Sequence, residues 1–163
     1  LIAHLPNRTV YTGLYSLFVL SGLVLIVWGK SLAPFTMVWE PPFSLRYLSS
    51  ILMIPAFILL VASNILNSYI RWQLRNPMLL GVFIWGISHL WANGDLASIL
   101  LFGSFSLWSG LKFVTLRNNS ESALVPKLKW LWRDSIAVIV GAVVYFLVFI
   151  NHGQLFGVGL ALN

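Results

Sequence analysis

Cysteine is absent from this sequence of 163 residues, and charged residues are scarce. Without cysteine, the chain can form no disulfide, thiolate nucleophile or Cys-ligated metal site. Aspartate, glutamate, lysine and arginine make up 9% of the residues, whereas a soluble domain carries about 25%. The chain is therefore poorly suited to water.

Acidic residues are especially few. The four of them are Glu40, Asp95, Glu121 and Asp134. We expect each one in a loop or at a helix end, so that no two carboxylates meet within an apolar stretch. This excludes a carboxylate pair for general acid–base catalysis or for a proton relay inside a membrane.

Apolar residues fill most of the chain, at 59% of the total and with a mean hydropathy of +0.88. Five stretches lack any aspartate, glutamate, lysine or arginine: residues 9–29, 47–70, 76–94, 96–111 and 135–163. About 20 apolar residues cross the hydrocarbon core of a bilayer as a helix. The sequence therefore predicts an all-α, polytopic transmembrane bundle with five spans, forming a single integral membrane domain over residues 1–163.

Basic residues are distributed unevenly along this predicted path. Five crossings place eight of the ten lysines and arginines on the side of the N-terminus: Arg8, Arg71, Arg75, Lys112, Arg117, Lys127, Lys129 and Arg133. Lys30 and Arg46 fall on the other side. Positively charged loops stay in the cytoplasm, so we expect the start of the chain inside and its C-terminus outside. The lipid bilayer with its anionic headgroups then accounts for the basicity, and no nucleic-acid partner is expected.

Residues 75–98 read as a helical hairpin, RNPMLLGVFIWGISHLWANGDLAS. Pro77 suits the first turn of a helix, and the Asn76 side chain before it is expected to cap that helix. Gly94 is expected to end it in a left-handed conformation. Asp95 is then expected to cap the next helix, with its carboxylate at the positive end of the helix dipole. The outer loop SLAPFTMVWEPPFSL, residues 31–45, is expected to be irregular and to cover this outer face.

One histidine, His89, lies within the apolar hairpin. Trp85, His89 and Asn93 share a helix face by their spacing of four residues, and Gly86 is expected to leave space beside the imidazole for a flat macrocycle. An ionisable residue inside a span marks a candidate functional site. The alternative is a neutral, hydrogen-bonded histidine that ties two helices together.

Three segments resemble the NnrU family of bacterial inner-membrane proteins: GLYSLFVLSGLVLIVWG (13–29), RNPMLLGVFIWGISHLWANGDLASILLFG (75–103) and HGQLFGVGL (152–160). The family is associated with nitric oxide and nitrite reduction in denitrifying bacteria. It is similar to the plant zeta-carotene isomerase, a membrane enzyme that binds b-type haem.

The resemblance implies that His89 is an axial ligand of haem b. From their helical spacing, Gly86 and Trp85 are expected beside the cofactor. In the isomerase relatives, the second ligand comes from a His-Ser pair on an additional N-terminal helix. The three histidines here precede Leu5, Leu90 and Gly153, so none forms that pair, and His152 is a candidate for the second ligand. A sixth helix missing before Leu1 would explain both the absence of a His-Ser pair and a first residue that is not methionine. Asn76 also departs from the family, which usually reads Arg-His-Pro there.

By this resemblance, we expect a haem-binding protein of the bacterial inner membrane with a role in nitrogen-oxide metabolism. Two other interpretations stay open. One is a haem-free accessory subunit or assembly factor within a larger membrane complex. The other is an isomerase that acts on a polyene in the bilayer, so the sequence leaves open whether the protein is an enzyme.

Overall fold

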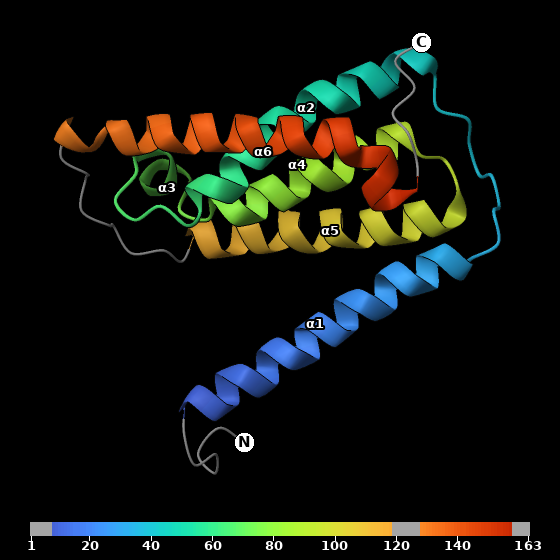
Figure 1. Ribbon diagram of the computed structural model, residues 1–163, viewed down its shortest axis with the longest axis horizontal. Coiled ribbons are helices and arrows are strands. Elements are labelled where there is room, and N and C mark those ends of the chain that lie inside the picture. The colour runs from blue at the N-terminus through green and yellow to red at the C-terminus, as the bar shows by residue number, and fades with distance from the viewer. Residues whose placement is uncertain (1–7, 119–127, 158–163) are drawn as a thin grey trace. The chain divides into compact units, whose positions relative to one another are not determined.

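The computed structural model describes residues 8–118 and 128–157, and these residues are folded almost entirely into helices (Figure 1). The six α-helices of these ranges are α1 (Arg8–Leu32), α2 (Phe43–Ala62), α3 (Tyr69–Leu74), α4 (Pro77–Ala92), α5 (Leu96–Asn118) and α6 (Trp132–Phe156). A short 3₁₀ helix, η2 (Leu128–Trp130), precedes α6. No strand forms in the described ranges, which confirms the all-α prediction.

The chain divides into two compact units, Leu1–Thr36 and Met37–Asn163. The described part of the first unit is dominated by α1, a helix of 25 residues. Lys30 lies in its last turn, where a cation interacts favourably with the negative end of the helix dipole. The second unit contains the other helices and every residue of the hairpin that holds His89.

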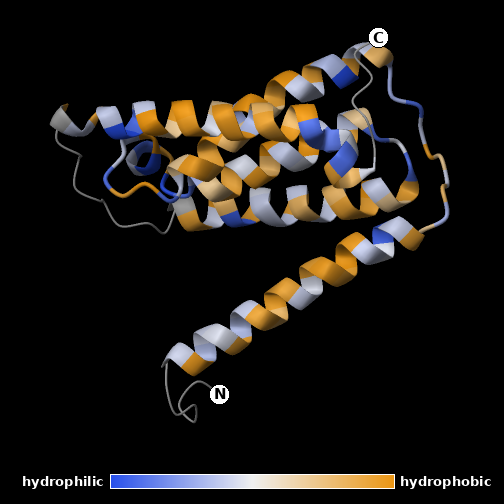
Figure 2. Ribbon diagram, viewed as in Figure 1, coloured by the Kyte–Doolittle hydropathy of each residue, from blue (hydrophilic) through white to orange (hydrophobic). Residues whose placement is uncertain are grey.

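Four helical segments are long and apolar enough to cross a membrane: Thr9–Leu32, Phe43–Ala62, Leu96–Leu116 and Trp132–Phe156. Figure 2 shows apolar residues along most of each long helix and hydrophilic residues around α3. The α4 helix has only 16 residues, which span about 24 Å at 1.5 Å per residue. The described helices are those of an integral membrane protein: four of the five predicted spans meet the length for a crossing, and the fifth corresponds to α4, a shorter apolar helix whose crossing stays a prediction.

In the second unit, α4 packs between α2 and α5, and α2 also packs against α6. Small residues allow these helices to approach closely. A Cβ atom on Gly141 of α6 would lie 2.6 Å from the Ile58 Cα atom of α2, closer than real Cβ contacts. Helix pairs in membranes rely on such small residues, because lipid is as apolar as the side chains and gives no hydrophobic drive to pack them.

Serine supplies much of the buried polar surface, and its hydroxyl groups are hydrogen-bonded. Ser88 Oγ donates to the Ile84 carbonyl oxygen at 2.7 Å, one turn earlier in α4. Ser49 Oγ of α2 donates across to the Ser88 carbonyl oxygen of α4 at 2.5 Å. Among the described residues, no buried side-chain nitrogen or oxygen lacks a partner. The interior therefore satisfies its own polar groups, as an apolar solvent requires.

The predicted span 47–70 is not one helix, because α2 ends at Ala62. The polar residues that follow bond the backbone locally: Ser63 Oγ and Asn64 Nδ2 both donate to the Leu60 carbonyl oxygen, at 2.6 and 3.0 Å. Asn67 then has a positive φ of 60°, a conformation that asparagine tolerates better than most residues. Such side-chain bonds compete with helix continuation, which is why the span stops early and a separate α3 begins.

Candidate functional site: an aromatic cluster around His89

The turn between α4 and α5 confirms one predicted cap. Asp95 Oδ2 accepts a hydrogen bond from the Ser98 backbone N–H at 2.9 Å, so Asp95 caps α5 as expected. Pro77 also occupies the first turn of α4 as expected, but Asn76 makes no side-chain capping bond, and that part of the prediction is wrong. The Asn76 backbone N–H instead donates to the Leu74 carbonyl oxygen at 2.7 Å.

Gly94 is not left-handed, contrary to our prediction. Helix α4 ends at Ala92, and its C-cap residue Asn93 is extended, with φ −129° and ψ 123°. Gly157 is the described glycine with positive φ. Glycine fits position 94 because a Cβ atom there would collide with the Trp39 carbonyl oxygen. The close approach lets the Val38 and Trp39 N–H groups donate to the Gly94 carbonyl oxygen, at 2.9 and 3.2 Å. Residues 37–39 therefore cover the α4–α5 turn, as expected for the outer loop.

The helix face predicted to hold His89 forms as expected. The ring centroids of Trp85 and His89 are 5.0 Å apart, and Asn93 Nδ2 donates to the His89 carbonyl oxygen at 2.9 Å. His89 Nδ1 lies 2.8 Å from the Trp85 carbonyl oxygen. A carbonyl oxygen can only accept, so Nδ1 carries the proton in this contact. In the neutral ring, Nε2 is then the nitrogen with the lone pair.

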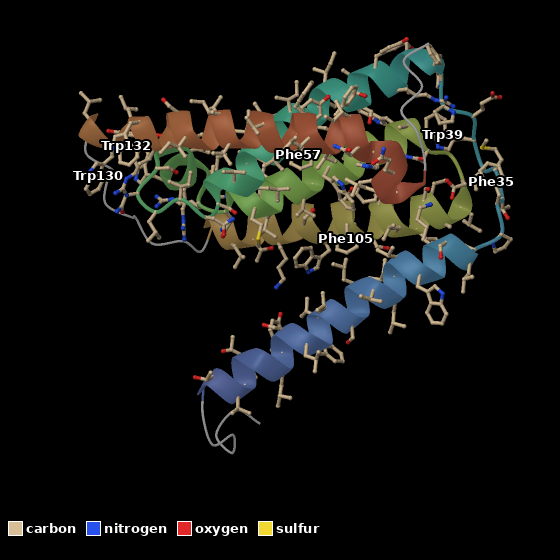
Figure 3. All side chains as sticks on the ribbon, in the orientation of Figure 1. Phe35, Trp39, Phe57, Phe105, Trp130 and Trp132 are labelled. Carbon is tan, nitrogen blue, oxygen red and sulfur yellow. The ribbon has the colours of Figure 1, made fainter. Side chains whose placement is uncertain are left out.

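Two phenylalanines of α5 complete an aromatic cluster made of Trp85, His89, Phe102 and Phe105. The His89 ring stacks on Phe102, with centroids 4.5 Å apart and planes at 28°. Trp85 meets Phe102 and Phe105 edge to face, at 5.0 and 5.9 Å; Phe105 is labelled in Figure 3. Sequence reasoning missed both phenylalanines, although their spacing of three residues on α5 places them on adjacent turns of one helix face.

The space that we expected beside Gly86 is filled by α5. A Cβ atom on Gly86 would collide with Ser106 Oγ and lie 2.9 Å from the Phe102 carbonyl oxygen. Gly86 is buried in the α4–α5 contact. Its missing side chain therefore serves close packing of two helices, and a macrocycle beside His89 has no room at this position.

The geometry of His89 suits axial ligation of haem in other respects. Histidines that bind a metal through one ring nitrogen usually donate the other to a carbonyl or carboxylate, and His89 Nδ1 meets the Trp85 carbonyl in this way. The ring is half-buried among aromatic side chains. The described residues contain no group of three or more histidine, cysteine, aspartate or glutamate side chains that could hold a metal ion, but haem iron needs only one or two axial ligands.

His152 lies in the last turns of α6, half-buried, with its ring centroid 5.0 Å from that of Phe156. The end of α6 and the α4–α5 turn lie at the same end of the second unit (Figure 1). His4, the remaining histidine, lies outside the described residues. The structure thus places one histidine in the aromatic cluster and a second on another helix at the same end.

Comparison with known families gives one full-length match. The family model described as NnrU protein matches residues 1–160 of the chain. Neither of two further comparisons, with curated proteins and with solved structures, gives a match. Because the matched range includes all the helices and the aromatic cluster, this chain belongs to the NnrU family.

Proposed function

We propose that this NnrU-family membrane protein binds haem b, with His89 as an axial ligand through Nε2. The observation that carries the proposal is the 2.8 Å contact between His89 Nδ1 and the Trp85 carbonyl oxygen. It fixes the tautomer that a neutral ligating imidazole needs and restrains rotation of the ring. Stacking of the ring on Phe102, with centroids 4.5 Å apart, supports the same orientation.

The chain's own residues would determine what the cofactor does. When bound, haem would supply one-electron redox chemistry. Trp85 and Phe102 hold the imidazole, while the apolar surfaces of α4 and α5 keep water away from it. Low polarity around a haem is one of the factors that set its potential.

The biological setting that we propose is nitrogen-oxide metabolism at the bacterial inner membrane, with the start of the chain in the cytoplasm and its C-terminus in the periplasm. The role in nitrogen-oxide metabolism and the inner-membrane location are proposed from the resemblance to the NnrU family, whose model matches residues 1–160. The orientation follows from the excess of basic residues on the side of the N-terminus.

A second axial ligand has two candidate sources. His152 is the other histidine in the described ranges, and α6 brings it to the end of the unit that holds the α4–α5 turn. The alternative, which we favour, is a histidine supplied from outside this chain. A double variant that lacks both His89 and His152 separates the two sources, because only the first predicts a further loss of haem beyond His89→Ala.

The test is the absorption spectrum of the purified full-length protein produced in cells supplied with a haem precursor. We expect a Soret band and a pyridine haemochrome spectrum of b type. His89→Ala should remove most of the Soret absorbance, and added imidazole should restore part of it by occupying the vacated axial position. Gln154→Ala is the control, because it removes an exposed polar side chain of α6 that is neither of the candidate ligands.

Two results would overturn the proposal: a wild-type protein without a Soret band, or a Soret band unchanged by His89→Ala. Far-ultraviolet circular dichroism on each variant shows whether the helices persist, so loss of haem is distinguished from loss of fold. A haem-free wild-type protein that co-purifies with other membrane subunits would favour the accessory-subunit function instead. Conversion of a polyene substrate without haem would favour an isomerase.

A further inference from the structure

The end of the second unit that contains α3 carries an excess of positive charge. We call it the basic end; it comprises α3, the start of α4, the last turns of α5 and the start of α6 (Figure 1). The charged residues whose side chains are described there are Arg71, Arg75, Lys112, Arg133 and Asp134. At the opposite end, near the α4–α5 turn, they are Glu40, Arg46 and Asp95. Among these described side chains, the excess of cations therefore lies at the basic end.

Asp134 does not neutralise these cations through an ion pair. Its two carboxylate oxygens accept the backbone N–H groups of Tyr69 and Ile70, each at 3.0 Å. In the described ranges, neither Arg71 nor Arg133 makes an ion pair with another side chain. Among the described residues, the two arginines close to this short helix are thus not paired with a carboxylate, although charge inside or beside a membrane is normally compensated.

The guanidinium of Arg133 is held in place by groups that leave most of its donors available. One terminal nitrogen donates to the Leu66 carbonyl oxygen at 2.6 Å. Its Cζ atom lies 4.9 Å from the ring centroid of Trp130 and 5.6 Å from that of Trp132; both residues are labelled in Figure 3. A guanidinium has five N–H donors in a planar fork that matches a phosphate group.

Several residues near Arg133 in the sequence have large apolar side chains that are exposed. Leu128 is 74% exposed, and Leu131 and Trp132 are about half exposed. Leucine and tryptophan beside arginine are typical of the boundary between acyl chains and headgroups, where the ring or stem is apolar and the charged tip stays in the polar layer. This arrangement fits a lipid better than a soluble acidic protein, which would leave these apolar side chains in water.

We propose that the basic end binds an anionic phospholipid, with Arg133 on the headgroup phosphate, Arg71 as a second cation, and the acyl chains against Leu128 and Leu131. The fork of Arg133 supplies two parallel hydrogen bonds to phosphate oxygens. The surplus charge of the basic end favours a headgroup with net negative charge over a zwitterionic one. This site is separate from the aromatic cluster and does not depend on haem.

Native mass spectrometry of the full-length protein tests this proposal. The protein is reconstituted with equal amounts of phosphatidylglycerol and phosphatidylcholine that have identical acyl chains. It is then released in the mass spectrometer, and the lipids that remain bound are counted. We expect the wild type to retain mainly phosphatidylglycerol. Arg133→Gln and Arg71→Gln should each reduce this preference about fivefold, as one basic residue near a charged membrane surface contributes about that much at physiological salt.

The matched control is Arg46→Gln, since Arg46 lies at the opposite end and also contacts an aromatic ring, with its Cζ atom 5.9 Å from the Phe43 centroid. It should leave the preference unchanged, and Arg133→Lys should keep most of it. An equal loss in Arg46→Gln, or no loss in Arg133→Gln with helix content intact, would overturn the site. Displacement of the lipid by inorganic phosphate would assign it to a free anion, and displacement by polyglutamate to an acidic protein; either result overturns the lipid assignment.

Discussion

Two glycines with similar sequence neighbours play different parts at the contact between α4 and α5. Gly86 follows Trp85 and Gly103 follows Phe102, so each is preceded by a member of the aromatic cluster. A Cβ atom on Gly86 would meet Ser106 and Phe102, whereas one on Gly103 would meet no heavy atom within 4 Å. Only Gly86 is therefore required by the packing that holds the His89 ring against Phe102.

Gly86→Ala should destabilise the protein, because the added methyl group forces α4 and α5 apart. Overpacking of this kind costs about 1–3 kcal/mol. Gly103→Ala, the matched control, should be neutral or raise stability by about 0.5–1 kcal/mol through its higher helix propensity. Thermal unfolding in detergent, followed by circular dichroism, measures both. Equal midpoints for the two variants would contradict the assigned role of Gly86.

At the scale of elements, α3 shows how a helix of six residues is kept in place. A helix of this length does not persist alone, because the cost of its first turn is not recovered. The Ser68 hydroxyl accepts the Arg71 N–H at 3.0 Å, and Asp134 of α6 accepts two more N–H groups. Arg75, which follows with a positive φ of 63°, is in a region that strains a residue with a side chain. Contacts from α6 therefore stabilise a turn that its own sequence does not.

Asp134→Ala should loosen α3, because it leaves the N–H groups of Tyr69 and Ile70 without their acceptors. Each lost acceptor costs about 1–3 kcal/mol when the donor stays buried. Hydrogen exchange measured by mass spectrometry should show faster exchange of peptides that cover residues 69–74. Asp134→Asn keeps one acceptor oxygen and should give an intermediate rate. Exchange at the wild-type rate in Asp134→Ala would show that α3 is held by other contacts.

At the scale of the whole molecule, charge sidedness and the short α4 decide how the chain sits in a bilayer. The cations of the basic end and the mixed charges near the α4–α5 turn are separated by the length of the bundle in the second unit (Figure 1). Positive loops face the cytoplasm, so the basic end is expected inside. If α4 crosses the membrane with only 16 residues, the bilayer must thin locally, or the residues that flank α4 must extend to the bilayer surface.

The absence of cysteine makes this topology directly measurable, since each introduced cysteine is the sole thiol. Glu40→Cys, Gln73→Cys and Leu96→Cys change exposed residues before α2, in α3 and at the start of α5. A membrane-impermeant maleimide added to intact cells should label the Glu40 and Leu96 variants, whereas the Gln73 variant should react only after permeabilisation. Labelling of all three from outside, or of the Leu96 and Gln73 variants from the same side, would contradict a crossing by α4.

The sequence by itself determined the helical class, the membrane setting, the family and the cap at Asp95. These depend on local or additive properties: apolar runs, the charge of loops, and a carboxylate one residue before a helix. The shared face of Trp85 and His89 was also predictable, because helical spacing alone sets it. The end of α2 at Ala62 was not, because competition between local side-chain bonds and helix continuation has no clear sequence threshold.

Only the tertiary structure decided which surface each small or aromatic residue meets. The Phe102 ring stacks on His89, and Gly86 packs against Ser106 instead of leaving space for a cofactor. Gly94 served the approach of the Trp39 carbonyl instead of a left-handed turn. In each case, the sequence did not show which residue of another segment would be the contact partner. That partner depends on the relative rotation of two helices or on the path of a loop. Both follow from packing of the whole unit and cannot be read from residue spacing along one helix.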